Sequence, residues 1–235
     1  MDRDEVIFFN FPIAMFEIVY QAPNLQKGFE NFLNKVINYC TGQKMADLNC
    51  NLKIASEELG YTWRNNDYGD ENTKSCFEAY NRYNDYKITT GIEHETLFQI
   101  RDNIKTYTAR SLITEIAFLA VKSIVGKKKY AATNYEYILH RMAGGIGGEM
   151  PKVLQSYEGK RRRLERLIYD LEKHNVSYYS VRGQRGFYVS TTLPAVELAV
   201  EVEKYRKPSM AAKRKERIAK QKAAGARLKT QNEIF

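Results

Sequence analysis

Apolar residues recur at helical spacing along most of this chain. In residues 27–40, Phe29, Phe32 and Val36 lie three and four positions apart, so one side of a helix there is apolar. Residues 108–125 repeat the spacing and end at Gly126, a residue type that favours helix ends. By this pattern, helices are predicted at residues 27–40, 52–59, 75–85, 108–125 and 135–142 and after Pro194.

The clearest amphipathic helix lies in the second half of the chain. Leucine and isoleucine recur between residues 164 and 171 at helical spacing, as in a helix with one buried side. The pattern predicts a long helix that ends at His174 and begins near Lys160 or, alternatively, at Pro151.

Signs of β structure are short and scattered. Residues 6–11 favour a strand, and residues 176–181 and 187–192 are two β-prone runs around a glycine-containing segment, 182–186. Glycines between two such runs are typical of a hairpin. We interpret residues 88–95 as a connection between the two halves of the chain.

These patterns predict a mainly α fold with small β elements, in an α+β arrangement. Residues 1–100 form a mainly helical N-terminal domain, residues 101–193 a second domain, and residues 194–235 a helix and a basic C-terminal tail. The length of the chain allows one large domain or two small ones.

Charge divides the chain more sharply than the apolar pattern does. The net charge is +9, yet residues 1–100 carry 9 basic and 15 acidic side chains. Residues 101–203 carry 17 basic and 11 acidic side chains, and residues 204–229 carry 11 basic and one acidic. An excess of this kind indicates that a polyanion meets the second half.

Basic side chains concentrate where the predicted helix at 160–174 begins, and backbone N–H groups favour phosphate at that end. Arginine can also hold a guanine edge through two hydrogen bonds. The candidate nucleic-acid-binding residues are Lys160, Arg161, Arg162, Arg163, Arg166, Tyr169 and Lys173 of this helix, Arg182, Gln184 and Arg185 of the hairpin tip, and Lys213, Arg214, Lys215 and Arg217 of the tail. The alternative for the arginine run is a solvated helix face.

The tail should repel itself in isolation and become helical against phosphate, because its positive charge is almost unbroken. The alternative is a solubilising tail without a specific partner.

Residues 108–192 give a helix, a short connector, a helix, a glycine turn, a helix and a hairpin, and the segment KRRRLERLIYDLEKHNVSYYSVRGQRGFYVS shows the last two best. This order resembles the winged helix-turn-helix family, including members found in replication initiators of plasmids and phages. The resemblance implies that residues 160–172 are a recognition helix for the major groove and that residues 182–186 are the wing. One departure is the turn, usually about three to four residues, where residues 145–159 intervene here.

A second helix-turn-helix segment lies in the first half. Residues 51–61, NLKIASEELGY, resemble the second helix of such a motif, and two modules in tandem would resemble plasmid replication initiators. The acidic balance of residues 1–100 instead favours a helical domain that forms a homodimer or docks a replication protein.

Catalytic and metal-binding patterns are missing from the sequence. His94, His140 and His174 form no ligand pair, and the glycine turn at 144–148 lacks the lysine of a phosphate loop. The three cysteines have neither zinc nor disulfide spacing and, with no signal peptide, indicate a reducing cytosol. The apolar segments are too short or too interrupted to cross a membrane.

We therefore expect a non-enzymatic, cytoplasmic protein without cofactor or metal that binds double-stranded DNA in phage- or plasmid-type replication initiation. A transcriptional regulator with the same domain is the nearest alternative. An adaptor or structural protein whose basic tail binds RNA or an acidic partner is the alternative from another class.

Overall fold

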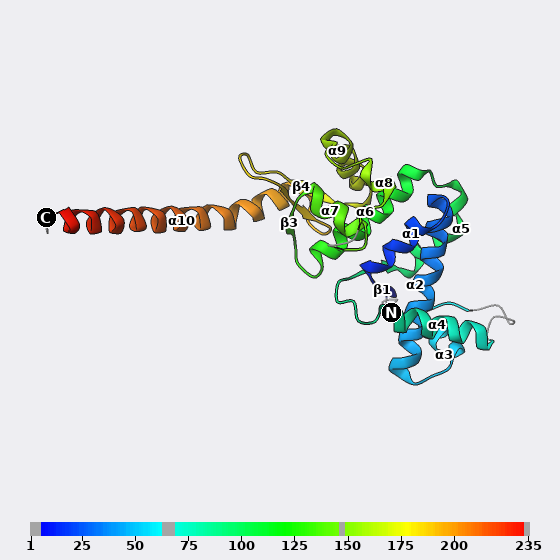
Figure 1. Ribbon diagram of the computed structural model, residues 1–235. Helices are drawn as coiled ribbons and strands as arrows, with labels where there is room; N and C mark the ends of the chain where they lie inside the picture. The colour runs from blue at the N-terminus through cyan, green and yellow to red at the C-terminus, as the bar shows by residue number, and fades with distance from the viewer. Residues whose placement is uncertain (1–5, 63–68, 146–148, 233–235) are drawn as a thin grey trace.

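The computed structural model describes residues 6–62, 69–145 and 149–232, without the side chains of residues 207–209, 212–213 and 220–232. These residues are mainly helical, with one two-stranded and one three-stranded antiparallel sheet. Figure 1 shows a body built from both halves of the chain and a long helix, α10 (Ala195–Asn232), that leaves it as a straight rod. The mainly α fold with small β elements is confirmed.

The N-terminal half packs its helices around α2, beside a two-stranded ribbon. Helix α4 crosses α2 so closely that a Cβ atom at Gly42 would lie 2.3 Å from the carbonyl oxygen of Cys76, so this crossing requires a glycine. In chain order the elements are β1 (Phe8–Pro12), η1 (Ile13–Phe16), α1 (Glu17–Gln21), α2 (Leu25–Leu48), α3 (Leu52–Glu58), α4 (Asp70–Tyr83), β2 (Thr89–Glu93), α5 (His94–Asp102) and η2 (Ile104–Thr106).

The C-terminal half contains a sheet of strand order β3-β5-β4, which α10 and α6 (Ala109–Val125) contact. Asn134 caps α7, since its Oδ1 accepts a hydrogen bond from the Tyr137 amide at 2.8 Å. The elements are α6 (Ala109–Val125), β3 (Ala131–Thr133), α7 (Tyr135–Met142), α8 (Lys152–Gln155), α9 (Arg161–Asp170), η3 (Leu171–His174), β4 (Ser177–Tyr179), β5 (Phe187–Ser190) and α10.

One apolar core joins the two halves, and α6 lies at its centre. This helix contacts β2 and α2 of the first half and α7 and α9 of the second. Ile116 of α6 is fully buried and belongs to the same cluster as Phe32 of α2 and Leu167 of α9. The helix α9 is therefore held on a support to which both halves contribute.

Residues 88–95, predicted to connect the two halves, contain a strand that the sequence analysis did not predict. These residues contain β2, which pairs with β1 in a register from Phe8 opposite Glu93 to Pro12 opposite Thr89. Thr90 and Ile92 are buried, and Thr90 Oγ1 donates a hydrogen bond to the Leu119 carbonyl at 2.9 Å. Threonine and glycine make the alternation weak, and the partner strand is distant in the sequence, so local pattern does not reveal the pairing.

The long helix predicted up to His174 is two elements. Helix α9 begins at Arg161 and ends at Asp170, and a 3-10 turn, η3, continues to His174. Pro151 instead precedes the separate short helix α8.

The backbone of the basic tail continues α10 as one helix. The sequence predicted that the tail becomes helical against phosphate, but the tail is helical here without a ligand, because alanine, lysine and arginine are favourable helix formers.

Candidate nucleic-acid interface

Helix α9 is amphipathic, and its two sides have different surroundings. Leu164, Leu167 and Ile168 are buried against the body. Residues spaced by three and four positions lie on one side of a helix. By that spacing, the solvent side of α9 and η3 carries a row of four exposed residues: Arg162, Arg166, Tyr169 and Lys173. We call this row the ridge.

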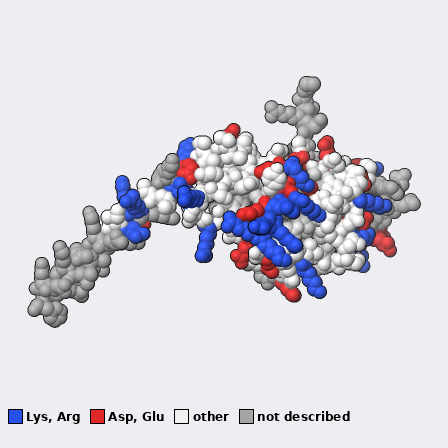
Figure 2. Space-filling view, turned by 90° about the horizontal axis from the view of Figure 1, so that it is seen from above, with Lys and Arg blue, Asp and Glu red and all other residues white. Residues whose placement is uncertain are grey.

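The ridge arginines are free to meet a ligand. Within the described residues, no ion pair includes Arg162 or Arg166, and Tyr169 is 63% exposed. Figure 2 looks down on the face where α9 lies and shows a large group of Lys and Arg side chains there. Unpaired guanidinium groups keep their donors available for phosphate or a base edge.

Two of the predicted DNA-binding residues, Arg161 and Arg163, make hydrogen bonds within the protein. Arg161 Nε donates to Glu165 Oε1 at 2.7 Å, and Arg163 Nη1 donates to the Ser156 carbonyl at 3.0 Å. Both lie beside the ridge, and Lys160 is exposed directly before the helix. The arginine run therefore consists of one ridge residue and two residues on opposite flanks of the helix.

Lys173 ties the end of the ridge to the core. Its Nζ lies 3.2 Å from Oε1 of the buried Glu115, and His174 Nε2 lies 3.1 Å from the same oxygen. Burial alone would raise the pKa of Glu115, but His174 and Lys173 together hold it below its ordinary value. The carboxylate is ionised at neutral pH and offsets part of the charge that Lys173 presents.

A second ion pair, which the sequence did not signal, fixes α9 against α6. Arg110 Nε donates to Asp170 Oδ2 at 2.7 Å and Arg110 Nη2 to Asp170 Oδ1 at 2.6 Å. Two parallel bonds between a guanidinium and a carboxylate set an orientation as well as a distance. The residues are far apart in the chain, and no local pattern indicates that they meet.

The predicted hairpin is present between β4 and β5. Gly183 and Gly186 have φ angles of 81° and 93°, in the left-handed region that glycine tolerates best. The tip residues Arg182, Gln184 and Arg185 are exposed, and Figure 1 shows the hairpin projecting from the body. Its arginines have no ion pair within the described residues.

The tail is rooted beside this hairpin and then leaves the body. Leu198 and Val202 pack against Val181 at the hairpin base, and the Tyr179 hydroxyl donates to Glu203 Oε1 at 3.2 Å. Of the four tail residues predicted to bind, Arg214, Lys215 and Arg217 are exposed, and the side chain of Lys213 lies outside the described residues. Because α10 points away (Figure 1), the tail cations do not join the ridge.

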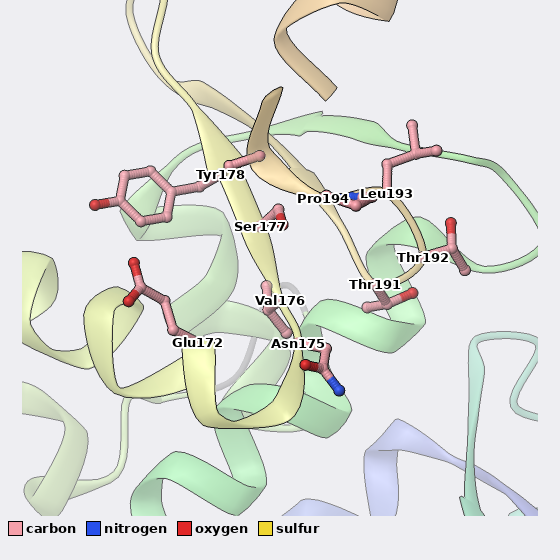
Figure 3. A pocket seen from close by; sticks show the side chains of 10 residues that line it. Glu172, Asn175, Val176, Ser177, Tyr178, Thr191, Thr192, Leu193 and Pro194 are labelled. Carbon is pink, nitrogen blue, oxygen red and sulfur yellow. The ribbon is translucent and has the colours of Figure 1, made fainter. Parts of the chain in front are cut away.

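A groove of about 850 Å³ lies where η3, β4 and the segment before α10 meet. Figure 3 shows Glu172 and Tyr178 on one side of β4 and Thr192 and Leu193 on the other. None of the described residues that line this groove is Lys or Arg. Its free carboxylate, Glu172, makes it unsuitable for phosphate.

Within residues 6–62, 69–145 and 149–232, no three His, Cys, Asp or Glu side chains are grouped so that they could hold a metal ion. No helix in the same residues is both long enough and apolar enough to cross a membrane. Comparison of the chain with protein-family models, curated proteins and solved structures found no match.

Proposed function

We propose that this protein binds double-stranded DNA by placing α9 in the major groove with the ridge facing the base edges. The observation that carries this proposal is the ridge itself: two guanidinium groups without acidic partners and an exposed tyrosine, on a helix whose other side is fixed to the core. A helix of about 10–12 Å diameter fits a groove about 12 Å wide.

The order of elements supports a winged-helix interpretation of residues 109–190. Helices α6, α7 and α9 are followed by β4, the hairpin tip and β5, and β3 between α6 and α7 adds the third strand to the sheet. In this interpretation α7 and α9 are the helix pair, with α9 as the recognition helix. The intervening residues contain α8, so the spacing stays longer than the usual turn.

We assign the binding to replication initiation of a phage- or plasmid-type element, on the resemblance of residues 108–192 to such initiators. A transcriptional regulator would use the same surface. Selection from a random duplex library gives the recognised sequence. Repeats of that sequence at a replication origin would support initiation, and a single copy at a promoter would support the regulator.

The direct test of DNA binding removes the two free arginines of the ridge. We expect Arg162→Ala with Arg166→Ala to weaken binding to the selected sequence far more than binding to random duplex, because arginine contacts to bases carry sequence information. The matched control is Lys74→Ala with Arg82→Ala, two helical cations of α4 that pair with Glu78 and Glu17. Equal losses in both variants would contradict the proposal.

The long basic helix α10 favours a second candidate function, in which the tail alone binds RNA or an acidic partner. Removing residues 208–235 distinguishes the two. If the tail holds all the affinity, the truncated chain binds nothing and the Arg162 and Arg166 changes have little effect. If the ridge reads DNA, the truncated chain keeps its preference for the selected sequence while its affinity falls and depends less on salt.

A further inference from the structure

The two flanks of α9 differ in charge. By helical spacing, Arg163 and Asp170 share one flank, while Arg161, Glu165 and Glu172 share the other. On the second flank Arg161 pairs with Glu165, and Glu172 has no ion pair among the described residues. That flank, which borders the groove of Figure 3, therefore carries one uncompensated negative charge.

The first flank borders a cavity of about 310 Å³ between α6, α8 and α9. Three guanidinium groups line it, those of Arg110, Arg163 and Arg166, together with the single carboxylate of Asp170. The cavity therefore carries a net charge of two positive units. Tyr157 and Leu167 also line the cavity, with a phenol ring and an apolar side chain.

The groups in this cavity are already oriented. Asp170 holds Arg110 through two hydrogen bonds, and the Ser156 carbonyl holds one nitrogen of Arg163. Arg166 belongs to both the ridge and the cavity lining and has no partner in the described residues. Planar guanidinium groups suit the tetrahedral oxygens of phosphate, which they bind through paired hydrogen bonds.

The position of the cavity favours one source of that phosphate. When a helix about 10–12 Å across enters a groove about 12 Å wide, its flanks lie next to the two phosphate rows. One flank of α9 carries the arginine-lined cavity and the other an unpaired carboxylate. The volume of the cavity equals that of roughly ten water molecules, which leaves room for a phosphate and part of its sugar.

We propose that this cavity is a phosphodiester pocket for one backbone phosphate of the duplex contacted by α9, in which Arg110 and Arg163 hold the phosphate and Arg166 lines the edge shared with the ridge. The proposal rests on the proposed function. It assigns the contact with the DNA backbone to one flank of α9, so the protein contacts one strand of the recognised duplex more strongly than the other. A free phosphate ester has the same chemistry and is distinguished by the test.

The test compares Arg163→Gln with Arg161→Gln, the same change on the two flanks of one helix. We expect R163Q to lower duplex affinity about tenfold, the effect of one charge-assisted hydrogen bond, and to reduce the slope of log affinity against log salt by about one. We expect R161Q to leave the slope almost unchanged and to lower affinity less than R163Q does, because Arg161 is paired with Glu165 and its loss removes no phosphate contact but exposes one carboxylate. The charge-preserving variant R163K should keep the slope, which separates loss of charge from a folding defect.

Duplexes with one neutral methylphosphonate, placed in turn at each position of the selected site, identify the phosphate. One position should weaken binding of the unchanged protein and of R161Q but not of R163Q. If the unchanged protein binds duplex while R163Q and R161Q behave alike, the pocket proposal is overturned and the proposed function stands. If the unchanged protein binds no duplex, both are overturned.

Titration with AMP in the absence of DNA tests whether the cavity instead binds a free phosphate ester. Saturable one-to-one binding of AMP that R163Q abolishes, together with unchanged duplex binding by R163Q, would assign the cavity to a free nucleotide and overturn the backbone assignment. Absence of AMP binding, with the methylphosphonate result above, supports it.

Discussion

Helices α4 and α9 each bury one side in their own half of the chain, but the cations on their exposed sides differ in whether they have acidic partners. Each follows a shorter helix and buries one side, α4 with Cys76 and Ala79 and α9 with Leu164 and Leu167. The cations of α4 have acidic partners, Lys74 with Glu78 at 3.9 Å and Arg82 with Glu17 at 3.2 Å, whereas the ridge arginines have none. The two helices are therefore alike in burial and differ in the pairing of their surface charges, which is why we propose α9 and not α4 as the helix that meets a polyanion.

The largest expected effect on DNA affinity comes from reversing the charge of the two ridge arginines of α9. We expect Arg162→Glu with Arg166→Glu to lower affinity for the selected duplex by more than about 10²-fold, since each arginine contact contributes about 1–3 kcal/mol. Fluorescence anisotropy at fixed salt measures the loss. Lys74→Glu with Arg82→Glu is the matched change on α4, and an equal loss there would remove the distinction between the helices.

The next effect concerns the core that the two halves share. Replacement of the fully buried Ile116 by alanine is expected to lower the free energy of unfolding by about 2–5 kcal/mol. Because α6 supports both halves, urea denaturation followed by hydrogen exchange should show α2 and α9 losing protection together. The control is Ile54→Ala, an exposed residue of α3, with an effect within about 0.5 kcal/mol. Protection lost only in α9 would mean that the halves unfold separately.

A smaller effect is expected at the hairpin tip. Arg182→Ala with Arg185→Ala should weaken binding to all duplex sequences to a similar degree and reduce the salt slope by about two, because phosphate contacts carry no sequence information. Titrations of selected and random duplexes at several salt concentrations measure both quantities. A change in sequence preference would instead place the tip at base edges.

The smallest expected effect is a pH dependence of stability at the end of the ridge. The pKa of Glu115 is lowered in the folded protein, so its stabilising contribution is complete above the unfolded value of about 4.3 and is lost as pH falls through the lower native pKa. Free energies of unfolding between neutral and acidic pH, measured for the unchanged chain and for Glu115→Gln, should converge at low pH. Parallel curves would contradict this contribution of Glu115.

Local signals predicted much of the fold. The helices at Ala109–Val125 and Tyr135–Met142 and the hairpin around Gly183 and Gly186 each follow from a few adjacent residues. The strands β2 and β3 escaped prediction because they are short and pair with strands distant in the sequence. Pairing of that kind depends on tertiary packing, which a local pattern does not contain.

The residues of the candidate site also divide into those that a local pattern predicted and those that it did not. The solvent-facing position of Arg162, Arg166, Tyr169 and Lys173 follows from the leucine stripe alone. Sequence reasoning missed Arg110 and Asp170, because a contact between two helices 60 positions apart has no local signature. It also grouped Arg161 and Arg163 with Arg162, since a run of like residues does not show which have partners.

The attachment of α10 has a mechanical consequence. Val181, Leu198 and Val202 form a small apolar cluster that is separate from the main core. Because a satellite cluster of this size has few buried contacts, we expect it to open at a lower free energy than the core does, and opening would detach α10 from the hairpin base. The half-buried Tyr130, Tyr179 and Tyr188, which pack against this cluster, would then become more exposed. Any ligand that tethers both α10 and the hairpin tip therefore closes the cluster by mass action.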